Sequence, residues 1–215
     1  MKRALIIGSS KGIGKSIKKK LSELKIKIIA PPRKELDTSN LDNVKKFIKN
    51  LNSIDYLILN TGGPPAKEFF SITENDWHKY HIQLFLSFAL ILQKIKLKNN
   101  GYIFLISSHT IKNPEDNLVL SNSYRVAISS VLKTVSKIYS KRKITCINIA
   151  PGPIKTNRLK KLVKNMKDFE KKLPLARAGS PDEIALFVQS IIRLEIKYLN
   201  GVIINFDGGL SKNLI

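Results

Sequence analysis

The chain has 215 residues, 43% of them hydrophobic, which fits one globular domain spanning residues 1–215 and excludes a disordered chain. No run of 18 or more apolar residues occurs and too few precede Gly8 for a signal-peptide core, so we expect no membrane span and a cytoplasmic location. The net charge of +22 is spread evenly and attracts anions of every kind, but no nucleic-acid-binding motif accompanies it, so we do not expect a nucleic-acid partner.

In chain order, short apolar runs alternate with longer segments of helical periodicity. The runs predict strands at 4–7, 26–30, 54–59, 102–106, 144–149 and 202–206. The segments between them predict helices at 12–24, 41–51, 73–98, 118–140, 157–172 and 181–195. This alternation is typical of an α/β fold: a three-layer, doubly wound parallel sheet (Rossmann fold) with helices on both faces.

Two of the predicted helices, 73–98 and 118–140, are more apolar than contact with one face of a sheet requires. An adjoining layer or a second subunit could cover their other sides. We favour a subunit, and therefore expect a homodimer or homotetramer that assembles through these helices.

A glycine-rich turn follows the first predicted strand and opens the first predicted helix. Its glycines let backbone N–H groups approach a pyrophosphate, which the start of the helix also favours. The residues that we expect to bind a dinucleotide here are Gly8, Ser10, Lys11, Gly12, Ile13 and Gly14.

The spacing of these glycines, G-x-x-x-G-x-G, resembles that of the short-chain dehydrogenase/reductase family, and the resemblance covers residues 3–211. Asn60-Thr61-Gly62-Gly63 matches the family's motif beside the cofactor, and Ala150–Thr156 matches its Pro-Gly motif. The segments 177–184 and 206–210 match its C-terminal part. The resemblance implies cofactor contacts from Asn60, Gly62, Pro151, Gly152, Ile154 and Thr156.

The charge near the second strand favours NADP(H), although NAD(H) stays open. Lys11 and Arg33 could both approach an adenosine 2′-phosphate, and no carboxylate ends the second strand, where NAD-preferring proteins usually carry one. By resemblance, Asp37 lies near the adenine. Only six residues separate it from Ala30, too few for the helix and strand usually found there, so we expect the adenine side to be shortened.

The family's catalytic residues are a serine, a tyrosine, a lysine four residues after it, and an asparagine in the preceding long helix. Ser108 matches the serine. Spacing places Ser121 at the tyrosine position, Arg125 at the lysine position and Leu84 at the asparagine position. Arginine can donate to ribose hydroxyls but cannot relay protons. Ser121 and Arg125, together with Gly62-Gly63-Pro64-Pro65, resemble a subset of the family labelled as similar to 3-oxoacyl-carrier-protein reductase.

Three other residues have candidate roles. Tyr124 shares a helix face with Ser121 and could act as a displaced acid, although packing in the core or at a subunit interface is the interpretation that we prefer. His109, beside Ser108, is of a type suited to a proton relay, but without a second supporting feature we interpret it as a loop histidine. The single cysteine, Cys146, excludes an intramolecular disulfide, and we expect no metal site.

Two functions remain open. The first is an NADP(H)-dependent oxidoreductase that interconverts a carbonyl and a secondary alcohol with a non-standard proton donor. Residues 155–172, with eight basic and two acidic side chains, would then form a lid over an anionic or carrier-bound substrate, unless they form only a solvated basic helix. The second is a dinucleotide-binding sensor or partner subunit with little or no dehydrogenase activity.

Overall fold

A computed structural model describes residues 1–213 and contains one parallel sheet in the order β2-β1-β3-β4-β5-β6. The strands are β1 (Lys2–Ile6), β2 (Ile26–Ile29), β3 (Ile54–Leu59), β4 (Leu97–Ile106), β5 (Thr145–Pro151) and β6 (Val202–Phe206). The helices are α1 (Gly12–Ser22), α2 (Leu41–Asn50), α3 (Glu74–His81), α4 (Ser87–Lys94), α5 (Val119–Ser140), α6 (Asn157–Leu162), α7 (Met166–Lys171) and α8 (Pro181–Arg193). No helix in this part of the chain is both long and apolar enough to span a bilayer.

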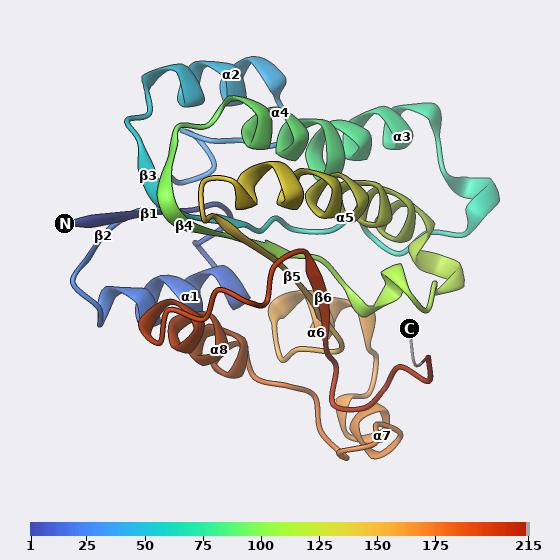
Figure 1. Ribbon diagram of the computed structural model, residues 1–215. Helices are drawn as coiled ribbons and strands as arrows, with labels where there is room; N and C mark the ends of the chain where they lie inside the picture. The colour runs from blue at the N-terminus through green and yellow to red at the C-terminus, as the bar shows by residue number, and fades with distance from the viewer. Residues whose placement is uncertain (214–215) are drawn as a thin grey trace.

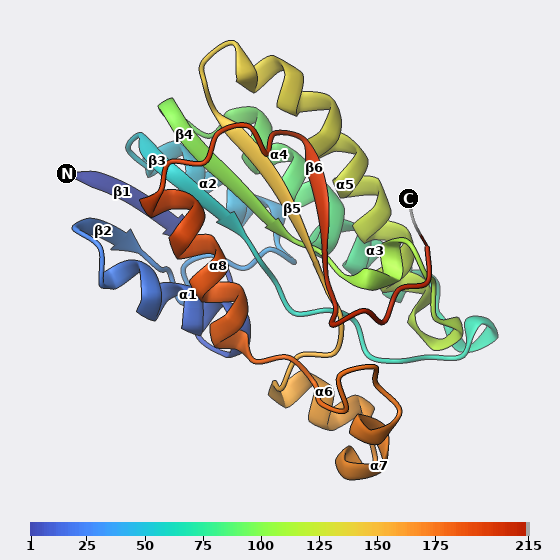
Figure 2. The same cartoon turned by 60° about the horizontal axis from the view of Figure 1, so that its bottom comes forward.

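Helices cover both faces of the sheet, so the predicted three-layer α/β fold is confirmed. Figures 1 and 2 show α1 and α8 on one face and α2, α4 and α5 on the other. Alternate residues of each strand enter opposite cores, as in β1, where Leu5 faces α2 and α4 while Ala4 and Ile6 face α1 and α8. This two-sided burial explains the nearly continuous apolar runs of the strands.

The chain changes direction across the sheet between β1 and β3. From β1 it first crosses to β2 at one edge and then returns to build β3, β4, β5 and β6 on the other side of β1. The loops that follow β1 and β3 therefore diverge at the carboxyl edge of the sheet. Open α/β sheets bind their ligands at such a position.

The helix predicted at 73–98 is wrong in its length and regularity. It is divided into α3 and α4 by a π-helical segment at Ile82–Leu86, and it ends at Lys94. Ile95 is extended, and Leu97 already pairs with Ile54, so β4 begins five residues earlier than the predicted start at Tyr102. Ile95 and Leu97 are buried and alternate with charged neighbours, which is a strand period rather than a helical one.

The single helix predicted at 157–172 is also wrong. Two short helices, α6 and α7, replace it because Val163 has extended backbone and Asn165 caps a new helix by accepting a bond from the Asp168 N–H. Both helices project from the body of the molecule near the carboxyl edge of the sheet (Figures 1 and 2). Glu170 fixes α7 through a 2.9 Å ion pair with Lys155 and a bond from the Ala178 N–H.

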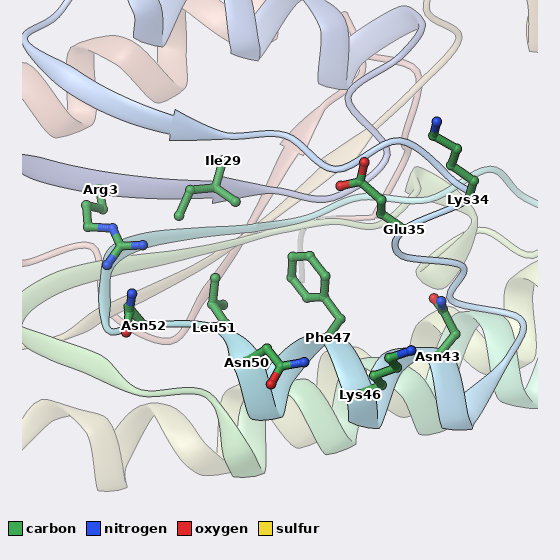
Figure 3. Close-up of a pocket in the computed structure, with 10 residues that line it drawn as sticks. All are labelled: Arg3, Ile29, Lys34, Glu35, Asn43, Lys46, Phe47, Asn50, Leu51 and Asn52. Carbon is green, nitrogen blue, oxygen red and sulfur yellow. The ribbon is translucent and has the colours of Figure 1, made fainter.

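The chain runs from β2 directly into a short loop and α2, with no helix or strand between them, as the spacing predicted. A cavity of about 470 Å³ lies between β2 and α2. Figure 3 shows its apolar floor of Ile29, Phe47 and Leu51, with amide and charged side chains around the rim. This cavity lies on the side of the molecule where the adenine half of a cofactor was expected to be shortened.

Candidate active site

A second, larger cavity of about 1010 Å³ lies at the carboxyl edge of the sheet, over the point where the chain changes direction. It extends from the turn after β1, past the loops after β3 and β4, to the segment after β5 and to α6. Nearly all the candidate site residues line it: Gly8, Ser10, Lys11, Gly12, Ile13, Arg33, Asp37, Asn60, Gly62, Ser108, Ser121, Arg125, Pro151, Gly152, Ile154 and Thr156. Gly14 supports the turn from beneath, and Tyr124 does not line the cavity.

The turn after β1 requires its glycines for close packing. Gly8 has φ +65° and Gly12 φ +52°, values that favour glycine. A Cβ on Gly14 would lie 2.3 Å from the Gly8 carbonyl oxygen. That same carbonyl accepts a 2.9 Å bond from Asn60 Nδ2, so the loop after β3 holds the turn after β1 in place.

In the loop after β2, Arg33 and Asp37 line the cavity and are bound to each other. Arg33 Nε donates to an Asp37 oxygen at 2.9 Å while three quarters of the arginine side chain stays exposed. Burial opposes the ionisation of Asp37, but bonds from Ser39 and Arg33 outweigh it and hold the pKa of this carboxyl below its usual value. The bond to Asp37 therefore holds Arg33 at the edge of the cavity. Within residues 1–213, other N–H groups of Arg33 remain free to bind an anion.

Arg125 lies deep in the cavity wall, where four of its five donors contact the protein. Nη1 donates to the carbonyls of Ile106 and Ser107 at 2.9 and 3.2 Å, Nη2 to the Thr61 carbonyl at 3.4 Å, and Nε to Ser121 Oγ at 3.2 Å. Arg125 therefore ties together the carboxyl ends of β3 and β4. Its burial, and secondarily the nearby Arg158 charge, lowers the pKa of Arg125 to about 10, so the group stays charged at neutral pH.

Ser108 presents a hydroxyl proton to the cavity. Its Oγ accepts from both the N–H and the Oγ1 of Thr110, at 3.3 and 3.1 Å. With these bonds made, its own O–H is free among residues 1–213 to donate to a ligand oxygen. This is the role that a carbonyl-positioning serine requires.

The contacts of His109 give its candidate role as a proton relay the second supporting feature that the sequence did not offer. The ring is buried, with Nδ1 3.2 Å from the Pro151 carbonyl oxygen and Nε2 3.1 Å from Glu115 Oε1. Because a carbonyl only accepts, Nδ1 carries a hydrogen and the exchangeable proton lies between Nε2 and Glu115. Half of the Glu115 side chain is exposed, so this pair connects the cavity with bulk water.

Tyr124 is separated from this set. Its hydroxyl donates to the Trp77 carbonyl at 3.0 Å, and its ring packs edge-on against the Trp77 ring. In the part of the chain that the structure describes, no tyrosine lines the cavity. The packing interpretation of Tyr124 agrees with these contacts, and the displaced-acid interpretation has no contact in its favour.

Three site residues escaped the sequence reasoning, and one of them is Glu115, the partner of His109 described above. Gln83 lines the cavity and donates to the Gly62 carbonyl at 2.7 Å, next to Leu84, which spacing had placed at the family's asparagine position. Both residues lie in the π-helical segment Ile82–Leu86, and π-bulges are frequent at functional sites. Arg158 on α6 also lines the cavity and was counted only as part of a basic segment.

Comparisons with known proteins agree with this geometry. The profile of a family described as enoyl-(acyl carrier protein) reductase matches residues 8–211. The chain is 28% identical to a probable 2,4-dienoyl-CoA reductase of Bacillus subtilis, covering 97% of this chain and 96% of the relative. It is 27% identical to a 3-oxoacyl-[acyl-carrier-protein] reductase of Rickettsia prowazekii, covering 97% and 96%. A short-chain dehydrogenase from Burkholderia cenocepacia, crystallised with NADP, superposes with a TM-score of 0.87 at 19% identity, covering 97% of both chains.

Proposed function

Because the chain belongs to the short-chain dehydrogenase/reductase family, we propose that it is an NADP(H)-dependent oxidoreductase that interconverts a carbonyl and a secondary alcohol by hydride transfer. The observation that carries the proposal is the continuity of one cavity from the glycine turn to Ser108. A cofactor anchored at the turn would have its reactive end near the hydroxyl that positions a carbonyl.

The residues present fit a dinucleotide. The turn of Gly8, Gly12 and Gly14 leaves room for a pyrophosphate at the start of α1, and Thr156 lies over Gly12 with its Cγ2 3.1 Å from where a Cβ would stand. When bound, the nicotinamide supplies or accepts the hydride. Pro151, Gly152 and Ile154 would hold its ring side, and Asn60 and Gly62 would contact the ribose side.

NADP(H) is the coenzyme that the charges favour, since Lys11 and Arg33 flank the adenine end and six of the cavity's lining residues are basic against two acidic ones. Solved relatives of the same fold have been crystallised with NADP and NADPH, which agrees with this preference.

The proton donor is the step in which this chain departs from its family. Ser121 occupies the tyrosine position and donates no useful proton, while Arg125 is committed to strand-end carbonyls. We assign the proton relay to His109 with Glu115, because the pair holds one exchangeable proton, lines the cavity beside Ser108 and contacts solvent. Ser108 would hold the carbonyl oxygen that receives that proton.

A dinucleotide-binding protein without turnover is the second candidate, favoured by the absence of a tyrosine from the cavity lining among residues 1–213. Fluorescence titration with NADPH and NADH, followed by NADPH oxidation with a panel of carbonyl compounds, separates the two. We expect NADPH to bind more tightly, Lys11→Glu to weaken NADPH about tenfold or more with little effect on NADH, and Ser108→Ala to abolish turnover. Binding without turnover of any carbonyl would favour the sensor, and no binding at all would refute both.

A further inference from the structure

Arg158 is a basic side chain of the cavity whose environment is unusually well built. From α6 it reaches the loop after β3, where Nη1 donates to the Gly63 and Pro64 carbonyls at 2.9 and 2.8 Å. A Cβ on Gly63 would lie 2.8 Å from Arg158 Cζ, so a larger residue at position 63 would displace the guanidinium from its present place. The sequence thus makes room for Arg158 at this place.

The donors of Arg158 that remain free form a fork. Both hydrogens of Nη1 are used by the loop carbonyls, which leaves Nε–H and Nη2–H without an acceptor among the described residues. These two N–H groups lie parallel on one edge of the guanidinium, and such an edge binds a carboxylate bidentately. Neither atom is sealed inside the protein, and Arg158 lines the cavity.

The positive charge at this place has no counter-charge in the protein. Within residues 1–213, no carboxylate lies within 4.0 Å of the guanidinium of Arg158 or of Arg125, and burial lowers the pKa of both groups. Arg125 is buried and Arg158 is partly buried, and positive charge removed from water in this way is costly unless an anion joins it. The cofactor phosphates are expected at the glycine turn, which leaves the substrate as the source of that anion.

Arg158 and Ser108 line the same cavity. Arg125 contacts the Ser107 carbonyl, so a second positive charge lies next to Ser108. One bound substrate can therefore present an anionic group to Arg158 and its carbonyl to Ser108.

We propose that Arg158 binds a carboxylate of the substrate, so that the substrates are oxo acids. This inference rests on the proposed function for the reaction but not for binding, because the fork can be tested by equilibrium binding alone. The family relatives named above act on thioesters, so a free-acid substrate would distinguish this chain from them.

The test uses pyruvate and acetoacetate, their methyl esters, and acetoacetyl-CoA, each titrated into the NADPH-saturated protein by calorimetry. The wild type should bind the acids in preference to the esters. Arg158→Gln should weaken the acids by about tenfold to hundredfold and leave the esters unchanged, since a bidentate charged contact is lost. Arg158→Lys, which keeps the charge but not the fork, should recover only part of the affinity.

The matched control is Lys161→Gln, which removes one positive charge from the same helix at an exposed position outside the cavity lining. It should change none of these affinities. NADPH affinity and the unfolding midpoint of Arg158→Gln should stay at the wild-type values, which shows that the loop and the cofactor site are intact. Equal binding of acids and esters, tight acetoacetyl-CoA binding insensitive to Arg158, or a loss of NADPH affinity in Arg158→Gln would each overturn the inference. Turnover of neutral ketones with any of these results would leave the proposed function standing.

Discussion

Arg125 is the residue that the family resemblance places at the position of the catalytic lysine. A lysine at this place would present a single ammonium to the cavity, whereas the planar arginine side chain distributes its donors over the carbonyls of Thr61, Ile106 and Ser107. The positive charge beside Ser108 is retained, but it is fixed to the ends of β3 and β4. In the proposed function, in which Ser121 and Arg125 stand at the family's tyrosine and lysine positions, another group must supply the proton.

We predict that His109→Gln lowers turnover by a factor of about 100 or more while NADPH affinity stays unchanged, because general acid–base groups contribute about 10²–10⁴-fold to rate. Glutamine can keep a bond to the Pro151 carbonyl but cannot exchange a proton. Steady-state kinetics with a carbonyl substrate and a parallel NADPH titration would measure both effects.

The control for that experiment is His78→Gln, at a histidine whose side chain is 73% exposed on α3. It should leave the rate unchanged. Full activity in His109→Gln would exclude the His109–Glu115 pair as the relay and would leave Ser108 without a known proton source.

At the scale of elements, the start of α8 could be foreseen from the sequence alone. Ser180, Pro181 and Glu183 predict a capping box, and the structure contains both of its bonds. Glu183 makes a further bidentate pair with Arg177, at 2.7 and 3.0 Å. The bond from Arg177, followed by that from the Ser180 N–H, lowers the pKa of Glu183 to about 2.

A carboxyl whose pKa is lowered by folding stabilises the folded state when it is ionised in both states, and this stabilisation is lost on protonation. We therefore predict that Glu183→Gln is less stable than the wild type at pH 7. The difference should persist down to about pH 4.5, the ordinary value for this carboxyl, and should shrink as the pH falls toward 2. Urea unfolding followed by circular dichroism across this range would measure it.

Asp182→Asn provides the comparison, since Asp182 lies in the same turn of α8 and makes no ion pair within residues 1–213. Its effect should be smaller at neutral pH, because part of any charge effect at an exposed helix start is screened by solvent. A Glu183→Gln difference that grows on acidification would contradict the linkage.

The division of the predicted helix 73–98 could not be foreseen in the same way. The sequence of this segment has no proline or glycine that would mark a break, whereas the π-helical segment Ile82–Leu86 contains Gln83, which contacts the Gly62 carbonyl of a distant loop. Local propensity describes only what a segment favours by itself. The end of α4 at Lys94 could have been predicted, because Ile95 and Leu97 alternate with lysines at the period of a strand.

At the scale of the whole molecule, the glycine turn could be predicted from a short motif, and the three-layer parallel fold could be predicted from the alternation of strands and helices. The Arg158 site was not, since it joins α6 to Gly63 across 95 positions of the chain. Neither residue is unusual locally: one is a basic residue among many, and the other is a glycine beside a proline. Only the folded chain brings the fork and the space for it together.

The outer surface formed by α4 and α5 carries apolar side chains for which the fold provides no full cover. Val126 and Ile138 on α5 are 46% and 64% exposed, and Leu86 and Leu90 on the neighbouring segment are only partly buried. We propose that two copies of the chain pack through this surface, since isolated exposed apolar residues are ordinary whereas several on adjoining helices indicate an interface.

Light scattering after gel filtration should give a dimer for the wild type and a monomer for Val126→Glu, which places a charge in the contact. Leu194→Glu changes a residue that is 62% exposed at the end of α8, on the opposite face of the sheet, and should remain dimeric. A wild type that is monomeric at tens of micromolar would contradict the dimer. A dimer that tolerates Val126→Glu and is broken by Leu194→Glu would place the interface elsewhere and leave the apolar surface of α4 and α5 without a partner.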